Sequence, residues 1–178
     1  MRMMSRQESD DWLKAKFHKG FSLRAPKVVY PNYRAYPHYV TYLLPTDTGK
    51  KTGIARILSS NVDATEPGLL LATEWGIWPS SENMALFDGY RKSLGESRSI
   101  GEAPGHLFDG SELTSVECLL DFFLYFYWGG FLVEGTGSMV VVISHDELFA
   151  VYMKDQSRFE EIKLWLDNMN LESRSAQL

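Results

Sequence analysis

Side chains able to act as acids, bases or nucleophiles gather in two short stretches of the sequence. "GEAPGHLF" contributes Glu102 and His106, and "ISHDEL" contributes Ser144, His145 and Asp146. Hydrolases use a Ser-His-Asp set, with serine as nucleophile and histidine as base. Adjacent side chains on an extended backbone point in different directions, so the contiguous "SHD" predicts a turn after "MVVVIS" rather than a triad. We expect Glu102 and His106 to lie on a Gly/Pro-rich loop.

The stretch "TEWGIWPSSEN" has the composition of a strand-to-helix turn. Glu74 and Trp75 stand where an apolar strand ends, and Trp78 precedes Ser80 and Ser81. Helix amides at such turns bind anions or polar ligands, although a serine that caps them is the commoner arrangement. Capping is therefore favoured, and a ligand site stays open. A ligand pocket that joined this turn to the two histidine loops would be lined by Glu74, Trp75, Trp78, Ser80, Ser81, Glu102, His106, His145 and Asp146.

No residue pattern indicates a metal, a cofactor or a catalytic set. Cys118 is the single cysteine of the chain, so neither an internal disulfide nor a cysteine-based zinc site is available. The histidines form no HxxxH or HxH pair, and no glycine-rich nucleotide-binding loop occurs. We predict no metal and no cofactor, assign no catalytic residue, and favour a protein that is not an enzyme.

Five tyrosines in "YPNYRAYPHYVTY" stand three residues apart: Tyr30, Tyr33, Tyr36, Tyr39 and Tyr42. Polyproline II has three residues per turn, so the proline-rich beginning of this segment predicts an extended arm with one aromatic edge. Such an edge could stack on nucleic acid, dock a partner protein, or cover the protein's own core. Because the chain is acidic and shows no nucleic-acid-binding motif, we favour core covering and consider nucleic acid the weakest alternative.

The charges divide unevenly along the chain. Residues 1–60 hold eleven basic and four acidic side chains, whereas residues 61–178 hold seven and nineteen. This polarity indicates either a basic protein partner or contact between the two segments in the folded molecule. A partner surface would draw on Tyr30, Tyr33, Tyr36, Glu96, Glu112, Glu117, Glu160 and Glu161.

The apolar spacing predicts four helices, over "SDDWLKAKFHKG", "WPSSENMALFDGYRKSLG", "DGSELTSVECLLDFFLYFYW" and "DQSRFEEIKLWLDNM". It predicts strands over "HYVTYLL", "IARILSS", "GLLLATEW" and "ELFAVYM", and a hairpin over "FLVEGTGSMVVVIS". Apolar residues nearly encircle the second half of the helix near residues 113–128, so we expect that half to be buried. In the last helix the residues expected on one apolar face are Phe159, Ile162, Trp165, Leu166 and Met169.

This order of elements is typical of an α+β fold, with a mainly antiparallel or mixed sheet and helices packed on one side. A length of 178 residues suits a single domain. We expect an N-terminal helix and extended Tyr/Pro-rich arm over residues 1–37, a globular domain over 38–170 and a frayed tail over 171–178. The start carries no signal peptide, and no stretch is long and apolar enough for a membrane span, so we predict a cytoplasmic protein without membrane contact.

The boxes "ATEWGIWPSSENMALFDGYRKSLG", "EAPGHLF" and "ISHDE", separated by an apolar helix, resemble a set of small uncharacterised bacterial proteins. The resemblance covers residues 70–147 and implies no established activity. A compact, acidic single domain without a catalytic motif is also similar in kind to the immunity proteins of polymorphic toxin systems. That second resemblance is one of class and transfers no functional residue.

Three functions follow as hypotheses. The first is a non-enzymatic, immunity-like interaction module whose acidic surface meets a basic protein partner. The second is a small-molecule-binding or hydrolase-like protein, with its pocket at the 74–82 turn and the His106 and His145 loops. The third is a self-associating structural subunit, so a homodimer stays open.

Overall fold

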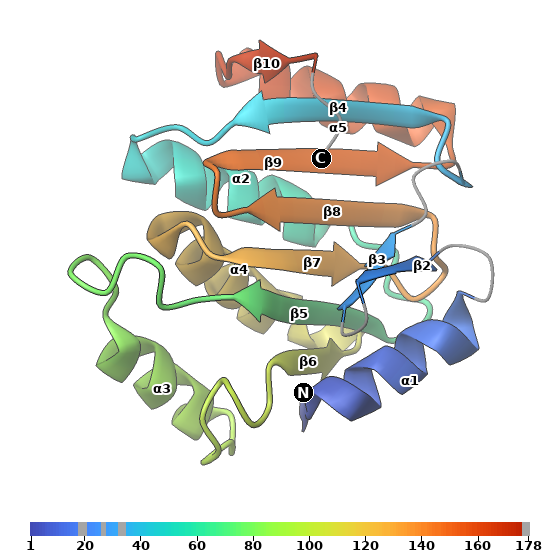
Figure 1. Ribbon diagram of the computed structural model, residues 1–178. Helices are drawn as coiled ribbons and strands as arrows, with labels where there is room; N and C mark the ends of the chain where they lie inside the picture. Colours follow the sequence, from blue (N-terminus) through green and yellow to red (C-terminus); the bar gives the residue numbers. More distant parts are fainter. Residues whose placement is uncertain (18–20, 26–27, 32–34, 176–178) are drawn as a thin grey trace.

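The computed structural model describes residues 1–17, 21–25, 28–31 and 35–175, which form an α+β fold around one large antiparallel sheet (Figure 1). Its eight strands lie in the order β1-β6-β5-β7-β8-β9-β4-β10, and neighbouring strands run antiparallel. The strands are β1 (Arg2–Met4), β4 (His38–Leu43), β5 (Gly68–Glu74), β6 (Gly105–Phe108), β7 (Gly129–Val133), β8 (Met139–Ser144), β9 (Leu148–Met153) and β10 (Ser173–Arg174). The predicted α+β class with an antiparallel sheet is confirmed.

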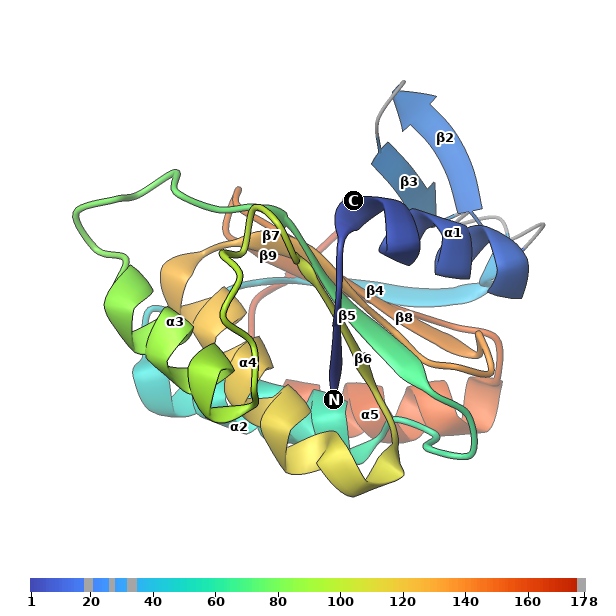
Figure 2. The same ribbon diagram turned by 90° about the horizontal axis from the view of Figure 1, so that it is seen from below.

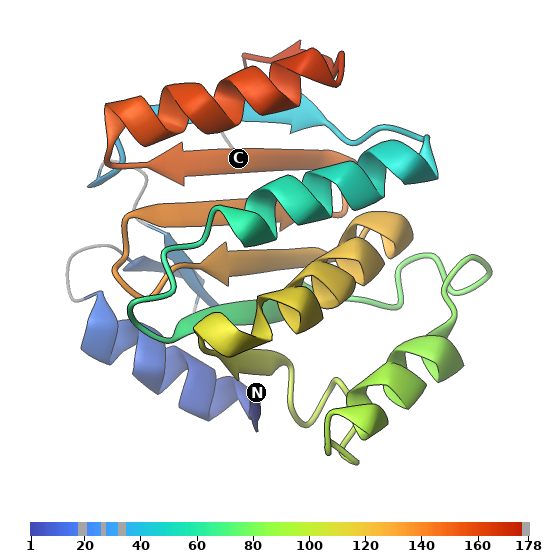
Figure 3. The ribbon, with the colours of Figure 1, turned by 180° about the vertical axis from the view of Figure 1, so that it is seen from behind.

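Three helices cover one face of the sheet (Figures 2 and 3), and two of them were predicted as helices. They are α2 (Thr48–Ser60), α4 (Leu113–Phe126) and α5 (Gln156–Asn168). The larger hydrophobic core lies between these helices and the strands, and Leu119, Leu120 and Phe123 of α4 are completely buried within it. The half-buried Phe122 and the exposed Tyr125 correct the expectation that the second half of α4 is buried on all sides.

A smaller layer covers the opposite face. It consists of α1 (Arg6–Lys16) and a hairpin of β2 (Phe21–Ala25) and β3 (Val28–Pro31), which stand on the other side of the sheet in Figure 2. Leu13 and Phe17 pack there against apolar side chains of the central strands. Because β5, β7 and β8 are buried on both faces, their sequences are nearly continuous in apolar residues.

The N-terminal arm contributes to this second layer. Tyr36 is buried and makes an edge contact with Tyr152, which agrees with core covering and removes Tyr36 from the exposed partner surface. Tyr39 stacks on the same ring, with centroids 5.7 Å apart. Tyr33 and the side chain of Tyr30 lie outside the described residues. The arm forms the β2–β3 hairpin, which replaces the expected polyproline segment over the described residues.

Two predicted elements differ from the structure. "IARILSS" belongs to α2, because Asp47 caps that helix at the Lys50 amide and Ile54, Ala55 and Leu58 form one buried helical stripe. "GHLF" forms β6 where a loop was expected, and there a Cβ on Gly105 would stand 2.1 Å from the Ser9 hydroxyl of α1. Glycine therefore permits the close approach of α1 to this strand.

The ends of the chain also depart from the expected outline. β1 and β10, from segments predicted as arm and frayed tail, pair with β6 and β4 of the main sheet. In α5 the predicted apolar face is correct for Phe159, Ile162 and Leu166, whereas Trp165 is 39% exposed. Within the described residues, no helix combines the length and apolar character that a membrane crossing requires.

A buried ion pair joins α5 to the β7–β8 turn. Glu134 is completely buried, and its Oε1 lies 2.5 Å from Nη2 of Arg158. The same carboxylate accepts hydrogen bonds from the Asp63 amide and, at 2.9 Å, from the Thr136 hydroxyl. Arg158 also donates to the Asn61 carbonyl. The buried carboxylate of Glu134 is thus compensated by several partners, as burial requires, and the partly exposed Arg158 is one of them.

Candidate functional site: a groove between two helices

The helix α3 (Met84–Ser93) stands apart from the three helices on the sheet (Figure 3) and forms one wall of a groove. Of its ten residues only Phe87 and Arg91 are buried. Asn83 caps the helix by accepting a hydrogen bond from the Leu86 amide at 3.0 Å, so the predicted caps, Ser80 and Ser81, are wrong by two or three residues. Gly95 follows this helix with φ +88°, the left-handed conformation that glycine readily adopts at helix ends.

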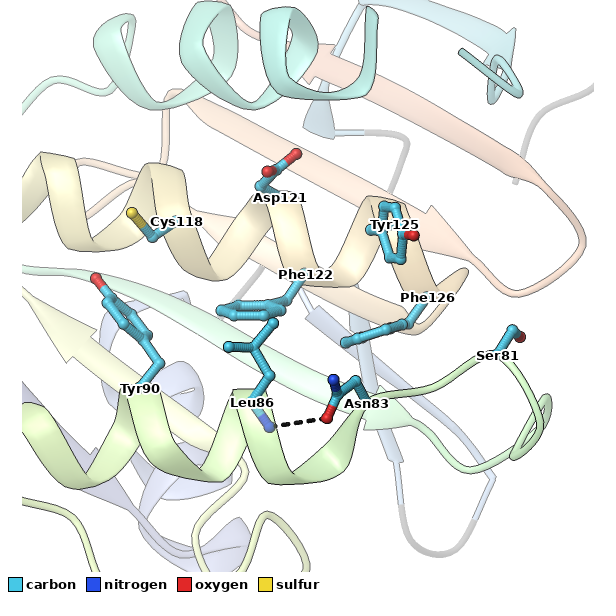
Figure 4. Close-up of a pocket in the computed structure, with 9 residues that line it drawn as sticks. All are labelled: Ser81, Asn83, Leu86, Tyr90, Cys118, Asp121, Phe122, Tyr125 and Phe126. Atoms are coloured by element: carbon cyan, nitrogen blue, oxygen red, sulfur yellow. Dashed lines mark hydrogen bonds between the residues drawn. The ribbon is translucent and has the colours of Figure 1, made fainter. Parts of the chain in front are cut away.

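The groove lies between α3 and α4 and has a volume of about 570 Å³, within the range of about 300–1,000 Å³ typical of ligand sites. Figure 4 shows Phe122 and Phe126 pointing from α4 toward α3, and Leu86 and Tyr90 pointing from α3 toward α4. The groove is therefore walled mainly by aromatic side chains. The lining residues are Ser81, Asn83, Leu86, Tyr90, Cys118, Asp121, Phe122, Tyr125 and Phe126.

One carboxylate lies at the rim of this aromatic groove, on the side of α4 that faces α2 (Figure 4). Asp121 lies with its Oδ1 3.1 Å from the Thr52 hydroxyl of α2. Burial raises the pKa of Asp121, and Glu117 adds to the rise, while the Thr52 hydrogen bond and Lys51 oppose it. A cation close to this carboxylate would stabilise its ionised form, because a nearby opposite charge lowers the pKa of an acid.

A buried lysine fixes the edge of α4 beside the groove. Lys51 is 3% exposed, and its Nζ lies 3.6 Å from the ring centroid of Tyr127 and 5.8 Å from that of Tyr125. These cation–π contacts orient the Tyr125 ring at the rim of the groove while its surface remains 51% exposed. The neighbouring Glu117 is engaged with Arg56 at 3.2 Å, which leaves Asp121 as the carboxylate of the groove.

The loop that precedes α3 also carries exposed apolar side chains. Ile77 is 37% exposed and Trp78 is 50% exposed on this loop, and Leu86 of α3 is 56% exposed. Glu82 holds this loop, accepting hydrogen bonds from the Gly76 and Trp78 amides at 3.0 Å each. The loop thus presents large apolar side chains on a backbone fixed by its own hydrogen bonds.

The structure brings three of the predicted pocket residues together at another place, the end of the sheet. Glu74 is the last residue of β5, and its Oε2 lies 2.5 Å from Nδ1 of His145 in the β8–β9 turn. Asp146 lies 3.5 Å from Nε2 of the same ring. The three side chains are 35–70% exposed, so water screens this cluster strongly.

His106 does not join that cluster. It lies in β6 opposite Leu70, completely buried, with its Nδ1 3.3 Å from the Leu70 carbonyl oxygen. Glu74 lies four residues further along β5, about 13 Å away at a strand rise of about 3.3 Å per residue. Burial, reinforced by Arg91, lowers the pKa of His106 to about 3, so its imidazole is neutral.

The other predicted pocket residues serve local structure or stand apart. Glu102 accepts hydrogen bonds from the amide and hydroxyl of Ser99, which lower the pKa of its carboxyl. Trp75 is half-buried and lies beside Gly101. Its Cζ2 atom is 3.8 Å from the position that a Cβ on Gly101 would occupy. Ser80 is exposed on the loop, and Ser81 lines the groove. The predicted pocket is therefore distributed over three places.

The predicted acidic surface is likewise divided. Glu96 is buried and bonded to Arg98, Glu112 closes the capping box with Asp109, and Glu117 is engaged with Arg56. Glu160 and Glu161 stay exposed on α5. Sequence analysis missed the α3–α4 groove itself. Its signal was the all-round apolar character of α4, which we interpreted as complete burial.

In the part of the chain that the structure describes, no group of three or more His, Cys, Asp or Glu side chains is placed to hold a metal ion. In comparisons with known proteins, no family model, no curated protein and no solved structure matches the chain. Function must therefore be argued from the groove and the charges around it.

Proposed function

We propose that the protein is a non-enzymatic protein-interaction module that binds a basic, apolar-anchored segment of a partner protein in the groove between α3 and α4. The observation that carries the proposal is the groove itself, with its aromatic walls and the single carboxylate of Asp121. Aromatic pockets that exclude water around a buried anchor dominate the free energy of protein–protein binding. Exposed apolar surfaces of this kind mark protein–protein interaction sites and ligand-binding grooves.

Charge supports the choice of a basic partner. Residues 74–126, which contribute α3, β6 and α4, hold nine acidic and three basic side chains, a balance of −6, while the whole chain carries −5. The negative charge is thus concentrated in the segment that builds the groove. Complementary fields accelerate encounter with a basic partner and disfavour acidic ones.

The immunity proteins of polymorphic toxin systems provide a class in which this function occurs, with a basic toxin domain as the partner. The support for that class is the compact acidic fold and the groove, and we include a bacterial, cytoplasmic setting in the proposal. A homodimer would place the same groove against a second acidic copy, which charge repulsion disfavours.

A second candidate function, small-molecule binding or hydrolysis, is favoured by one contact. The 2.5 Å approach of Glu74 to His145 has the geometry of a base held by an orienting carboxylate. Asp146 flanks the other nitrogen, and Ser144 donates a hydrogen bond to Asp146 at 3.2 Å instead of to the histidine. Because the serine is directed away from the base, the contact supports a binding cluster better than a nucleophilic one.

The proposal is tested with two synthetic helical peptides that carry the same leucine and tryptophan anchors. One peptide has arginine at the remaining charged positions, and the other has glutamate at those positions. We expect the arginine peptide to bind at low salt, with an affinity that falls steeply as the salt concentration rises. Leu86→Ser should weaken binding at least about tenfold, the loss of one anchor of about 1.4 kcal/mol. Asp121→Asn should weaken it by a smaller factor.

Leu164→Ser is the matched control. Leu164 is 58% exposed on α5 and Leu86 is 56% exposed on α3, so the two variants remove equal apolar surface from different helices. Fluorescence anisotropy and calorimetry give the affinities. Equal weakening by both variants, equal binding of the two peptides, or no binding of the arginine peptide at low salt would contradict the proposal.

A further inference from the structure

Three buried nitrogen atoms beneath α3 have no hydrogen-bond partner among the described residues. They are Nε of Arg91, Nε2 of His106 and Nε1 of Trp128. The three side chains are 1%, 0% and 0% exposed. All three pack around Phe87, whose ring centroid lies 5.5 Å from the Arg91 guanidinium carbon, 6.4 Å from the His106 ring and 4.8 Å from the Trp128 ring.

Arg6 Nη2, Tyr36 OH and Thr41 Oγ1 are also unpartnered elsewhere in the described residues, but only beneath α3 do three such atoms belong to side chains that contact one ring. Within Arg91, the lack of a partner is confined to Nε. The remaining guanidinium nitrogens of Arg91 donate to backbone carbonyls, Nη1 to Arg98 at 3.3 Å and Nη2 to Ala103 at 2.5 Å. A buried N–H without an acceptor costs about 1–3 kcal/mol, so native proteins rarely leave one unsatisfied. Three such atoms around one phenylalanine indicate a missing partner at this place.

The chemistry of the three nitrogens specifies what that partner must offer. Arginine Nε and tryptophan Nε1 only donate hydrogen bonds. The Leu70 carbonyl only accepts, so the contact at 3.3 Å places the proton of His106 on Nδ1 and leaves Nε2 as an acceptor. The low pKa of His106 agrees with this neutral form. The set therefore comprises two donors and one acceptor.

We propose that Arg91, His106 and Trp128 form a binding site for one hydroxyl oxygen, supplied by an internal water or by the hydroxyl group of a small organic molecule. A hydroxyl oxygen accepts the two N–H groups and donates its own proton to His106. A carboxylate does not fit, because it would face the lone pair of Nε2 without a proton to donate. An ammonium group does not fit, because it cannot accept from Arg91 or Trp128.

The site lies directly behind the groove. Phe122 of the groove wall packs on Phe87 at 5.6 Å, and Phe126 packs on Trp128 at 5.3 Å. An organic hydroxyl would thus have aromatic rings around its apolar part. Phe87 and Arg91 are also the two buried residues of α3, so the hydroxyl site is where this helix is anchored. The inference stands independently of the proposed partner.

The test is nuclear magnetic resonance of the whole chain labelled with nitrogen-15. The Nε1–H signal of Trp128 and the Nε–H signal of Arg91 are assigned with Trp128→Phe and Arg91→Lys. We expect both N–H groups to show direct cross-relaxation with a long-lived water, unlike the indole of Trp165, which is 39% exposed. The absence of such a signal, together with no response to phenol, overturns the proposal.

Phenol distinguishes the two sources of the hydroxyl. If an organic hydroxyl occupies the site, millimolar phenol removes the water signal and shifts both N–H resonances, whereas anisole, which cannot donate, does not. If only water occupies it, the water signal persists in phenol. His106→Leu should abolish the long-lived water at both N–H groups, and His145→Gln, remote at the sheet end, should not. An unchanged water signal in folded His106→Leu counts against the three-residue site.

Discussion

Two buried charged groups, Glu134 and Arg91, are held in very different ways. Glu134 is bonded to Arg158, to the Asp63 amide and to the Thr136 hydroxyl, so every neighbouring element is tied to its carboxylate. Arg91 reaches two backbone carbonyls, retains an unpartnered Nε, and has no carboxylate within 4.0 Å among the described residues. Glu134 has several hydrogen-bond partners from neighbouring elements, whereas Arg91 keeps one buried N–H without a partner.

The difference distinguishes the two ends of the molecule. At Glu134 the turn, α5 and the loop after α2 are fixed together, and the two charges are compensated there. At Arg91 the peripheral helix α3, whose two buried residues are Phe87 and Arg91, lies beside a groove. Binding sites commonly occur where packing is least complete, because a closed network leaves no group free for a ligand.

The largest expected effect is in Glu134→Ala. This substitution leaves the partly exposed Arg158 without its carboxylate, and the Asp63 amide and Thr136 hydroxyl without their acceptor, so we expect a loss of about 3 kcal/mol of unfolding free energy. Urea denaturation measures the loss, and Glu161→Ala, exposed on α5, is the control with an expected change within about 0.5 kcal/mol. A loss as small as that of the control would show that the network does not stabilise the fold.

An intermediate effect is expected in acid, at the loop that supplies the Arg91 acceptors. Hydrogen bonds from the Arg98 side chain lower the pKa of Glu96 from its ordinary 4.5 to about 2. The unfolded chain therefore binds a proton at a higher pH than the folded one. The contribution of the ionised Glu96 to the unfolding free energy is therefore complete above pH 4.5, and it is lost as the pH falls toward about 2.

Urea unfolding between pH 6 and pH 2 checks this dependence. Glu96→Gln should remove its part of the acid slope, while Glu160→Gln, exposed on α5, should leave the slope close to that of the unmodified chain. Identical slopes for the Glu96→Gln and unmodified proteins would mean that the carboxylate contributes nothing to stability.

The smallest effect is expected at Arg91 itself. Arg91→Met leaves two carbonyls without a donor but removes a desolvated charge, so we expect a loss of about 1–2 kcal/mol. Lys92→Met, exposed on the same helix, serves as the control. If Arg91→Met lost as much unfolding free energy as Glu134→Ala, the Arg91 contacts would stabilise the fold as strongly as the Glu134 network. That result would contradict the difference between the two regions.

Local patterns were sufficient for most elements. The cap and apolar stripe of α4, the glycine turn between β7 and β8, and the amphipathic α5 depend on residues close in the chain, so their positions were predictable. "IARILSS" failed because its β-branched and apolar residues fit a short strand as well as a helix. The α2 cap at Asp47 decides between them.

The candidate site was predictable in only a few residues. Ser81 was predicted for a pocket and lines the groove, whereas Leu86, Phe122 and Tyr125 were interpreted as core or not singled out. His106 and His145 were grouped by residue type, and the sheet register separates them. The boxes that resemble small bacterial proteins remain a prediction.

From the sequence alone came the α+β class, the acidic balance and the lack of a catalytic motif, because these depend on composition and short-range periodicity. The tertiary structure alone decided that α3 stands off from α4, that Asp121 lines the rim of an aromatic groove, and that Arg91, His106 and Trp128 pack around Phe87. Those features join residues tens of positions apart, and their proximity is set by strand order and helix packing rather than by any local pattern.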